Sequence, residues 1–439
     1  MSEVIWRNAY MKKAQRTNAR DALRKVITPG SRVFFSMAAS QPQTLLNALA
    51  DDYDFYRDVE IVNIYLFSDH PLAKPGMESS FRCVSLQNSS TMSRRWDEGR
   101  IDFLPIHYSS IPPVFSDSGP SPIDVALIQV SPPDRKGNFS LGASTCLTYP
   151  LAKGAKQIIA EVNEQAPRTC GPCYLREDEI DYIVETSHPL IPFPDITIGE
   201  EEKKIAANAI ELIPDGATIQ IGVGKLPVAI LRFLEGKKDL GVHSGMICDE
   251  CVDLFAKGVF TNRKKNLYPG KLITGELFGS EKLFSFAHEN SSIEMHPVEV
   301  THNSALIGTI DHFIAINSTI SVALDGQMNG EFLNGTQIGG VGGLFDFFQG
   351  AFVGGGKSIT VLNSTASRGK VSRIFSTFEK GTPITIPRYL SDIVVTEFGI
   401  AELKGKNLRQ RAEALIAIAH PDFRDRLWEE SMQHRNTLK

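Results

Sequence analysis

The sequence lacks an apolar run of the roughly 18 residues that a membrane-spanning helix needs. Its opening segment, MSEVIWRNAYMKKAQR, is charged and no apolar core follows it, which argues against a secretory signal. The sequence also lacks a large excess of charge of either sign: 46 Lys and Arg against 51 Asp and Glu give a net charge of −5. This balance offers no general surface for nucleic acid. We therefore expect a cytoplasmic protein that binds neither membrane nor nucleic acid.

Cysteine is scarce, but four of the six cysteines form two Cys-x-x-Cys pairs, at Cys170/Cys173 and Cys248/Cys251. A thioredoxin-type redox pair needs a strand directly before it, whereas EVNEQAPRT reads as a loop. A zinc ribbon needs pairs roughly 15–20 residues apart, and these are about 75 apart, although a site could still assemble in the fold. Chance pairing is favoured, and we expect no metal site.

The chain is long enough for more than one core. At 439 residues, with 42% hydrophobic and 22% charged content, it is typical of a two-domain soluble protein. Residues 26–46 and 212–231 share one plan: a helix, a turn, a short apolar strand, a loop of small residues, a proline and another helix. Further short apolar runs at 59–66, 125–130, 157–162, 240–243, 272–274 and 313–317 are typical of buried parallel strands. The sequence predicts two similar open α/β domains, residues 1–195 and 196–439, with ligands beyond the carboxyl ends of the strands.

Glycine is concentrated in one segment. Nine glycines lie within residues 334–356, NGTQIGGVGGLFDFFQGAFVGGG, and its phenylalanines distinguish it from a flexible linker. Glycine permits unusual backbone conformations and close approach of a ligand, and unshielded N–H groups can hold phosphates or a developing oxyanion. The segment therefore indicates an ordered binding site, not a flexible linker.

Two more glycine segments carry lysine. GVGKLP at 222–227 follows the strand ATIQI and opens a helix, a place that favours an anion, although a plain tight turn has the same pattern. GGGKS at 354–358 and the basic loop containing Arg368, Lys370 and Arg373 suit a polyphosphate such as that of coenzyme A, or a solvated surface.

These blocks carry a resemblance over nearly the full length. VALIQVSPPDRKGNFSLG, AEVNEQAPRT, IGVGKLP, LGVHSGMICD, AINSTISVALDGQMNGE, GGVGGLFDF and PRYLSDIVVTEFGIAELKGKNLRQRAEALI occur in order. The chain resembles the acetyl-CoA hydrolase/transferase family of class I coenzyme A transferases, which includes 4-hydroxybutyrate and butyrate CoA-transferases. The resemblance implies duplicated open α/β sheets with the active site in the cleft between them. It also implies transfer of coenzyme A between an acyl-CoA and a small carboxylic acid, no permanently bound cofactor, and a homodimer or homotetramer.

The chain departs from the family at the nucleophile. Relatives use a glutamate in a motif like H-T-E-M followed by Asp, whereas this chain reads His243-Ser-Gly245-Met-Ile-Cys-Asp249. Glycine forms no acyl anhydride and no thioester with coenzyme A. Glu276, in LITGELFGS, ends an apolar strand and is our candidate replacement, with the alternative that it caps a helix or pairs with a cation; Glu250 is a weaker candidate.

Loss of the covalent route is the other interpretation. The protein would then be an acyl-CoA hydrolase, with His243 and Asp249 orienting water, a transferase acting through a direct complex, or a catalytically silent CoA-binding protein. The glycine segments do not separate these alternatives, because each needs coenzyme A bound.

Other family positions are carried over from the resemblance. Those expected to bind the substrate are Gly222, Val223, Gly224, Lys225 and Leu226 in the loop that contacts coenzyme A, Gly339, Gly340, Gly342 and Gly343 facing the reacting carbonyl, and Lys370 near the phosphates. Met37 to Ser40 would line the acyl pocket. Leu344 and Cys170 replace the expected Gln and His, which predicts a less polar cleft.

Overall fold

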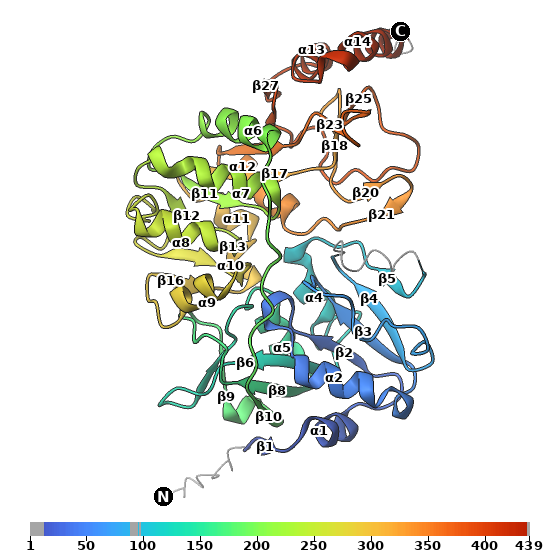
Figure 1. Ribbon diagram of the computed structural model, residues 1–439, viewed down its shortest axis with the longest axis vertical. Helices are drawn as coiled ribbons and strands as arrows, with labels where there is room; N and C mark the ends of the chain where they lie inside the picture. Colours follow the sequence, from blue (N-terminus) through green and yellow to red (C-terminus); the bar gives the residue numbers. More distant parts are fainter. Residues whose placement is uncertain (1–12, 88–94, 96–97, 437–439) are drawn as a thin grey trace, which may run out of the picture.

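The computed structural model describes residues 13–87, 95 and 98–436, arranged around two mainly parallel sheets (Figure 1). The first sheet has eight strands in the order β1 (Gln15–Arg16), β10 (Tyr182–Thr186), β8 (Gln157–Asn163), β6 (Val125–Val130), β2 (Arg32–Phe35), β3 (Val59–Asn63), β4 (Phe81–Ser85) and β5 (Ile101–Phe103). Every neighbouring pair in it is parallel. Its helices are α1 (Ala19–Val26), α2 (Gln43–Asp51), α4 (Ile111–Phe115) and α5 (Thr148–Gly154).

The second sheet has six strands in the order β12 (Gly241–Val242), β11 (Thr218–Ile221), β17 (Phe313–Ser318), β22 (Lys357–Val361), β26 (Ile393–Thr396) and β27 (Gly399–Glu402). All its pairs are parallel except β26 with β27. Its helices are α6 (Glu200–Ile210), α7 (Lys225–Phe233), α8 (Asp249–Ala256), α9 (Glu281–Ala287), α10 (Val298–Thr301), α11 (Ser304–Ile307), α12 (Leu344–Val353), α13 (Leu408–Ala417) and α14 (Pro421–Asn436).

Short pairs of strands complete the second half. They are β13 (Met246–Ile247) with β15 (Glu276–Leu277), β14 (Leu272–Thr274) with β16 (Ile293–Met295), β19 (Met328–Asn329) with β18 (Ser321–Ala323) and β25 (Ile374–Phe375), β20 (Phe332–Leu333) with β21 (Thr336–Gln337), and β23 (Thr365–Ala366) with β24 (Val371–Ser372). In the first half, β7 (Asn138–Ser140) pairs with β9 (Tyr174–Arg176). Among the described helices, none is long and apolar enough to cross a bilayer.

The predicted fold class is confirmed. Helix α1, strand β2 and helix α2 repeat the plan of α6, β11 and α7, as the two matching sequence units predicted. Alternate residues of β2 pack on opposite faces of its sheet, Phe34 in one hydrophobic cluster and Val33 and Phe35 in another. Both faces are therefore covered, which is why the strands read as short continuous apolar runs.

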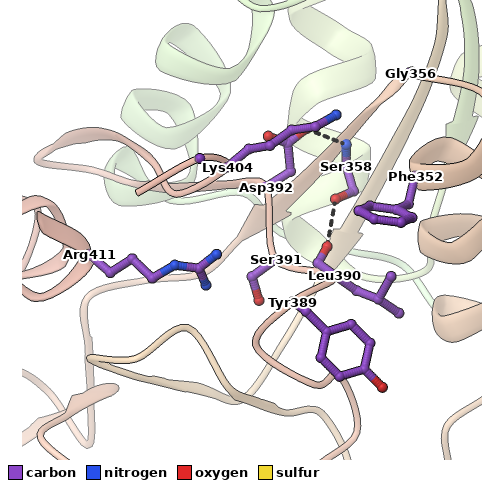
Figure 2. Close-up of a pocket in the computed structure, with 10 residues that line it drawn as sticks. Phe352, Gly356, Ser358, Tyr389, Leu390, Ser391, Asp392, Lys404 and Arg411 are labelled. Carbon is purple, nitrogen blue, oxygen red and sulfur yellow. Dashed lines mark hydrogen bonds between the residues drawn. The ribbon is translucent and has the colours of Figure 1, made fainter. Parts of the chain in front are cut away.

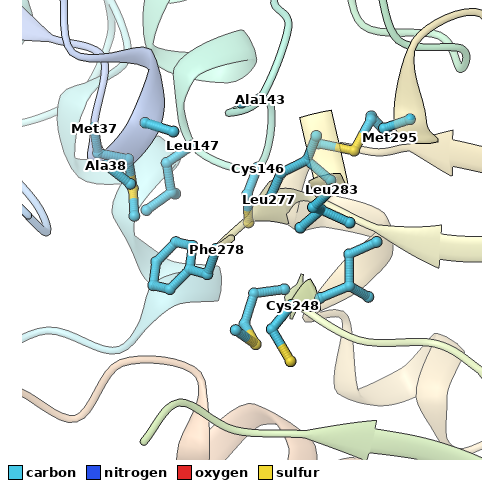
Figure 3. Close-up of a cluster of buried hydrophobic side chains, with 14 of the residues drawn as sticks. Met37, Ala38, Ala143, Cys146, Leu147, Cys248, Leu277, Phe278, Leu283 and Met295 are labelled. Carbon is cyan, nitrogen blue, oxygen red and sulfur yellow. The ribbon is translucent and has the colours of Figure 1, made fainter. Parts of the chain in front are cut away.

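One hydrophobic cluster joins the two halves. It contains residues of the first sheet such as Ile128 and residues of the second such as Ile316. Figure 3 shows where they meet: Cys146 of the first half lies beside Leu277 and Phe278 of the second. The boundary at residues 195 and 196 stays a prediction, between β10, which ends at Thr186, and α6, which begins at Glu200.

Candidate active site

The two sheets direct their carboxyl ends at one cavity of about 450 Å³. From the first half it is lined by Met37, Tyr65, Gln87 and Tyr108, which follow β2, β3, β4 and β5. From the second half it is lined by the glycine loops at 222–224 and 338–344, with Gly245, Glu276 and His302. The carboxyl ends of parallel strands are the usual place for a ligand in open α/β sheets, and here the carboxyl edges of both sheets line one cavity.

The loop after β11 brings bare backbone to this cavity. Gly224 has φ +116°, a conformation that side chains rarely adopt, and a Cβ on Gly222 would lie 2.7 Å from Oδ1 of Asn317. Lys225 begins α7 and is exposed, whereas Leu226 is buried in the core and does not line the cavity. The loop thus offers glycine backbone and a helix N-terminus, with a lysine at its rim.

The loop before α12, in the second half, contacts the first half directly. A Cβ on Gly340 would lie 2.9 Å from the carbonyl oxygen of Leu86, and Tyr108 N–H donates to Gly342 O at 3.1 Å. Within the described part of the chain, the N–H groups of Gly340, Val341 and Gly343 have no hydrogen-bond acceptor. They are therefore available to a negatively charged ligand atom.

A polar clasp holds this loop beside the first half. His107 Nδ1 lies 2.9 Å from Oδ1 of Asp346, in the first turn of α12, and the N–H and hydroxyl of Ser109 donate to the same carboxylate. This carboxylate raises the pKa of His107 through the hydrogen bond. The clasp fixes the register of the glycine loop against the first half.

Glu276 lies in the cavity wall, in the middle of a short strand assembly. Strand β15 pairs with β13, placing Glu276 opposite Met246, and Glu276 also bridges Ser144 of the first half. Its side chain is 3% exposed, and within the described structure neither carboxylate oxygen has a hydrogen-bond partner of good geometry. Burial raises its pKa well above the usual value, an effect that the nearby Ser144 hydroxyl and Cys146 N–H only partly offset.

Glu276 is the one carboxylate among the described residues that line the cavity. The alternative that it caps a helix or pairs with a cation is wrong, because it lies in a strand and no ion pair to it is found among the described residues. Glu250 instead pairs with Arg232 at 2.9 Å, away from the cavity.

Gly245 borders the same wall, and its missing side chain leaves a space that His302 occupies. A Cβ at position 245 would lie 2.6 Å from Cε1 of the His302 ring. His302 follows α10 and was missed by the sequence analysis, as were Tyr65, Gln87 and Tyr108. The last three follow strand ends and could have been found by searching those loops, whereas nothing local marks His302.

Several expectations need correction. Gly354 to Gly356 directly precede β22, which begins at Lys357, so this segment lies at the amino edge of the sheet, at the other end of the strands from Gly222. Gly356 and Ser358 line a separate pocket of about 140 Å³ there (Figure 2). Lys370 is exposed on the β23–β24 hairpin, which follows the carboxyl end of β22, but does not line the cavity. Within Met37 to Ser40, only Met37 lines the cavity. Leu344 also lines the cavity, whereas Cys170 does not.

Neither His243 nor Asp249, the residues expected to orient water in a hydrolase, lines this cavity. The buried His243 ring contacts the carbonyl oxygen of Val300 at 3.2 Å, and burial lowers its pKa to about 3. Asp249 accepts from the N–H of Ser280. All six cysteines are free thiols, and no cluster of three or more metal-ligating side chains is found among the described residues.

Comparison with known proteins identifies the family. The N-terminal domain of acetyl-CoA hydrolase/transferase matches residues 3–194, and the C-terminal domain matches residues 279–431. The chain belongs to the acetyl-CoA hydrolase/transferase family. It is 43% identical to the 4-hydroxybutyrate coenzyme A transferase of Clostridium kluyveri over 97% of this chain and 98% of that protein. It is 34% identical to the succinyl-CoA:cyclohexane-1-carboxylate CoA transferase of Geobacter metallireducens, over 95% and 98% of the two chains.

Solved structures agree with the fold. RipA from Yersinia pestis superposes with a TM-score of 0.89 at 31% identity, covering 96% of this chain and 98% of that one. A 4-hydroxybutyrate CoA-transferase from Porphyromonas gingivalis gives 0.82 at 34% identity, over 96% and 98%. The predicted family and the predicted enzyme class, acyl-CoA:carboxylate CoA-transferase, are confirmed by these similarities. That Gly245 stands at the family's nucleophile position stays a prediction.

Proposed function

We propose that this CoA-transferase uses Glu276 as its nucleophile. The observation that carries the proposal is the isolated position of this carboxylate, buried in the wall of the cavity that Gly245 and the glycine loops also line. A buried carboxylate without hydrogen-bond donors is poorly stabilised and therefore reactive once ionised.

In the first half-reaction, a carboxylate oxygen of Glu276 attacks the thioester carbonyl. A C–O bond forms, the C–S bond breaks, and coenzyme A leaves as the thiolate. The thiolate then attacks the γ-carbonyl of Glu276 in the mixed anhydride, which forms a glutamyl thioester and releases the first carboxylate. The second carboxylic acid, as its anion, reverses these two steps and leaves with coenzyme A.

The negative charge that develops on the carbonyl oxygen needs donors that are already in place. The free N–H groups of Gly340, Val341 and Gly343 are the donors we assign to it. Lys225 and Lys370, both exposed on the carboxyl edge of the second sheet, are assigned to the phosphates of coenzyme A. The loop of Gly222 to Gly224, with Leu226 anchoring its helix, would hold the pantetheine arm against backbone, and Gly339 leads the second loop into place.

The cellular setting follows from the same chemistry. The substrates are an acyl-CoA and a small carboxylate, and the exchange is neither a reduction nor an oxidation, so we propose no permanently bound cofactor. We further propose a homodimer or homotetramer, on the resemblance to the family, and a cytoplasmic location, on the charged N-terminal segment and the lack of a membrane-length apolar run.

The test is an exchange assay with and without an acceptor acid. Wild-type protein is incubated with an acyl-CoA, and free thiol and new acyl-CoA are followed. Acceptor-dependent exchange supports the transferase, and thiol release without acceptor indicates a hydrolase. If neither activity is detected, the protein is a silent CoA-binding protein. Borohydride reduction after exposure to acyl-CoA should trap a modification on Glu276.

The matched variants are Glu276→Gln and Glu250→Gln. Glu276→Gln should abolish exchange and trapping, because an amide cannot form the anhydride. Glu250→Gln removes a carboxylate that pairs with Arg232 outside the cavity and should retain both. Full exchange by Glu276→Gln would rule out the assignment.

A further inference from the structure

Glu331 lies at the entrance of the loop that carries the free N–H groups. The carbonyl oxygen of Glu331 accepts from the N–H groups of Ile338 and Gly339 at 2.8 and 3.1 Å. Glu331 directly precedes β20 and Ile338 directly follows β21, so these bonds join the two ends of the hairpin that the strands form. The backbone of Glu331 therefore fixes where the loop begins.

The side chain of Glu331 reaches the same loop through Gln337. Nε2 of Gln337 donates to Oε2 of Glu331 at 2.8 Å and to the carbonyl oxygen of Gly339 at 3.0 Å. Both neighbours of this amide are acceptors, so its nitrogen and not its oxygen must face them. The carboxylate thus orients the amide, and the amide holds the carbonyl group of Gly339.

The carbonyl of Gly339 and the N–H of Gly340 belong to one peptide group. A trans peptide group is planar, and no cis peptide bond occurs among the described residues, so these two bonds point in opposite directions. A carbonyl held by Gln337 therefore turns the N–H of Gly340 away from Gln337. Gly340 lines the cavity, whereas Gln337 and Glu331 do not. Two side chains outside the cavity lining thus set the direction of a donor within it.

The other carboxylate oxygen of Glu331 is anchored to a separate segment of the chain. Oε1 accepts from the hydroxyl of Thr385 at 2.8 Å, and this hydroxyl accepts from the N–H of Gly330 at 2.9 Å. The N–H of Thr385 donates to the carbonyl oxygen of Met328, also at 2.9 Å. Hydrogen bonds at both oxygens oppose rotation of the carboxylate, so its contact with Gln337 keeps one geometry.

Closure of the hairpin does not explain this carboxylate. Strands β20 and β21 pair through their backbones, and the backbone bonds to Glu331 O close the loop behind them. The Glu331 side chain is buried, and no cation forms an ion pair with it among the described residues. A buried carboxylate that is hydrogen bonded only to neutral donors costs stability, and such costs concentrate at functional sites.

We propose that Glu331 is a positioning residue for coenzyme A transfer, which acts through Gln337 to direct the N–H of Gly340 at the oxygen of the reacting thioester carbonyl. This role rests on the proposed function, which assigns that N–H to the developing negative charge. A donor already in place stabilises the transition state more than the bound substrate, because the charge on the oxygen grows as the tetrahedral carbon forms. Loss of this orientation should therefore lower kcat and leave the binding of acyl-CoA nearly unchanged.

Steady-state exchange kinetics of Glu331→Ala and Gln337→Leu test this role. Removal of one oxyanion donor lowers kcat on the order of 10²- to 10³-fold in other enzymes, so a donor that is present but misoriented should cost about 10- to 100-fold. KM for acyl-CoA should stay nearly unchanged. The double variant should be no slower than the slower single variant, because both substitutions break the same chain of contacts. Glu413→Ala, at a glutamate paired with Arg409 on α13, is the control and should keep the wild-type kcat.

Wild-type kcat in folded Glu331→Ala or Gln337→Leu overturns the positioning role. A rise in KM at unchanged kcat, or losses that multiply in the double variant, overturns it as well. If Glu331→Ala does not fold, Gln337→Leu decides, because residue 337 is partly exposed in a hairpin that backbone pairing holds. Exchange by Glu276→Gln overturns the assignment of the nucleophile alone. No exchange by the wild type overturns the proposed function and the role of Glu331 together.

Discussion

Restoring a glutamate at position 245 should fail unless His302 is removed. The Cβ of any residue at 245 would lie 2.6 Å from the ring, about 1 Å inside normal carbon–carbon contact. The ring has no room to retreat, because Gly343 and Phe347 close its other side. Gly245→Glu should therefore cost about 1–3 kcal/mol of stability by overpacking, and it should not gain exchange activity.

The double variant Gly245→Glu/His302→Ala removes the conflict. Its loss in free energy of unfolding should be smaller than the sum of the two single losses by about 0.5–3 kcal/mol, the usual range for residues in contact. Exchange should exceed that of His302→Ala, since the new carboxylate would stand at the position predicted for the family's nucleophile. Denaturant unfolding and the exchange assay measure both quantities.

The control for this cycle is Gly339→Ala in the same cavity wall. A Cβ there would meet nothing closer than 3.5 Å, so its unfolding midpoint should match that of the wild type. If the effects of Gly245→Glu and His302→Ala simply add, to within about 0.5 kcal/mol, the two side chains do not share a space and the reasoning about that space is refuted.

Three other outcomes are expected. The raised pKa of Glu276 means that folding must keep this carboxyl protonated, so the free energy of unfolding falls as pH rises above about 4.5, its usual value. Glu276→Gln lacks this carboxyl and should lose less stability than the wild type between mildly acidic and alkaline pH, as measured by thermal melts. The raised pKa of His107 stabilises the fold fully below about 6.5 and loses this effect as pH rises through the raised value, so Asp346→Asn should lower Tm more in mild acid than in alkali. Lys225→Ala and Lys370→Ala should each raise KM for acyl-CoA with little change in kcat, and added salt should shrink the difference; an unchanged KM at low salt counts against their contact with the phosphates.

Local patterns predicted many strands of this fold, such as β2, β3, β6, β8, β11 and β17, but not β4, β5, β10 or β26. The helix–strand–helix units around β2 and β11 were visible as apolar runs between amphipathic stretches, because both faces of each sheet are buried. The glycine loops were visible because only glycine tolerates the backbone of Gly224 or the approach of Gly340 to Leu86. Glu276 stood out as an acid after an apolar run, although the strand predicted to end there, β14, ends at Thr274 and Glu276 begins β15.

Only the tertiary structure decided which of these features share a cavity. Gly354 to Ser358 has the composition of a binding loop, yet it leads into a strand whereas Gly222 follows one, and a parallel sheet places those two ends at opposite edges. His302 carries no local signal, because its place depends on two missing side chains, at positions 245 and 343, that lie on other segments of the chain. Sequence fixes what each segment can form; the volume left between packed segments determines which side chains face the substrate.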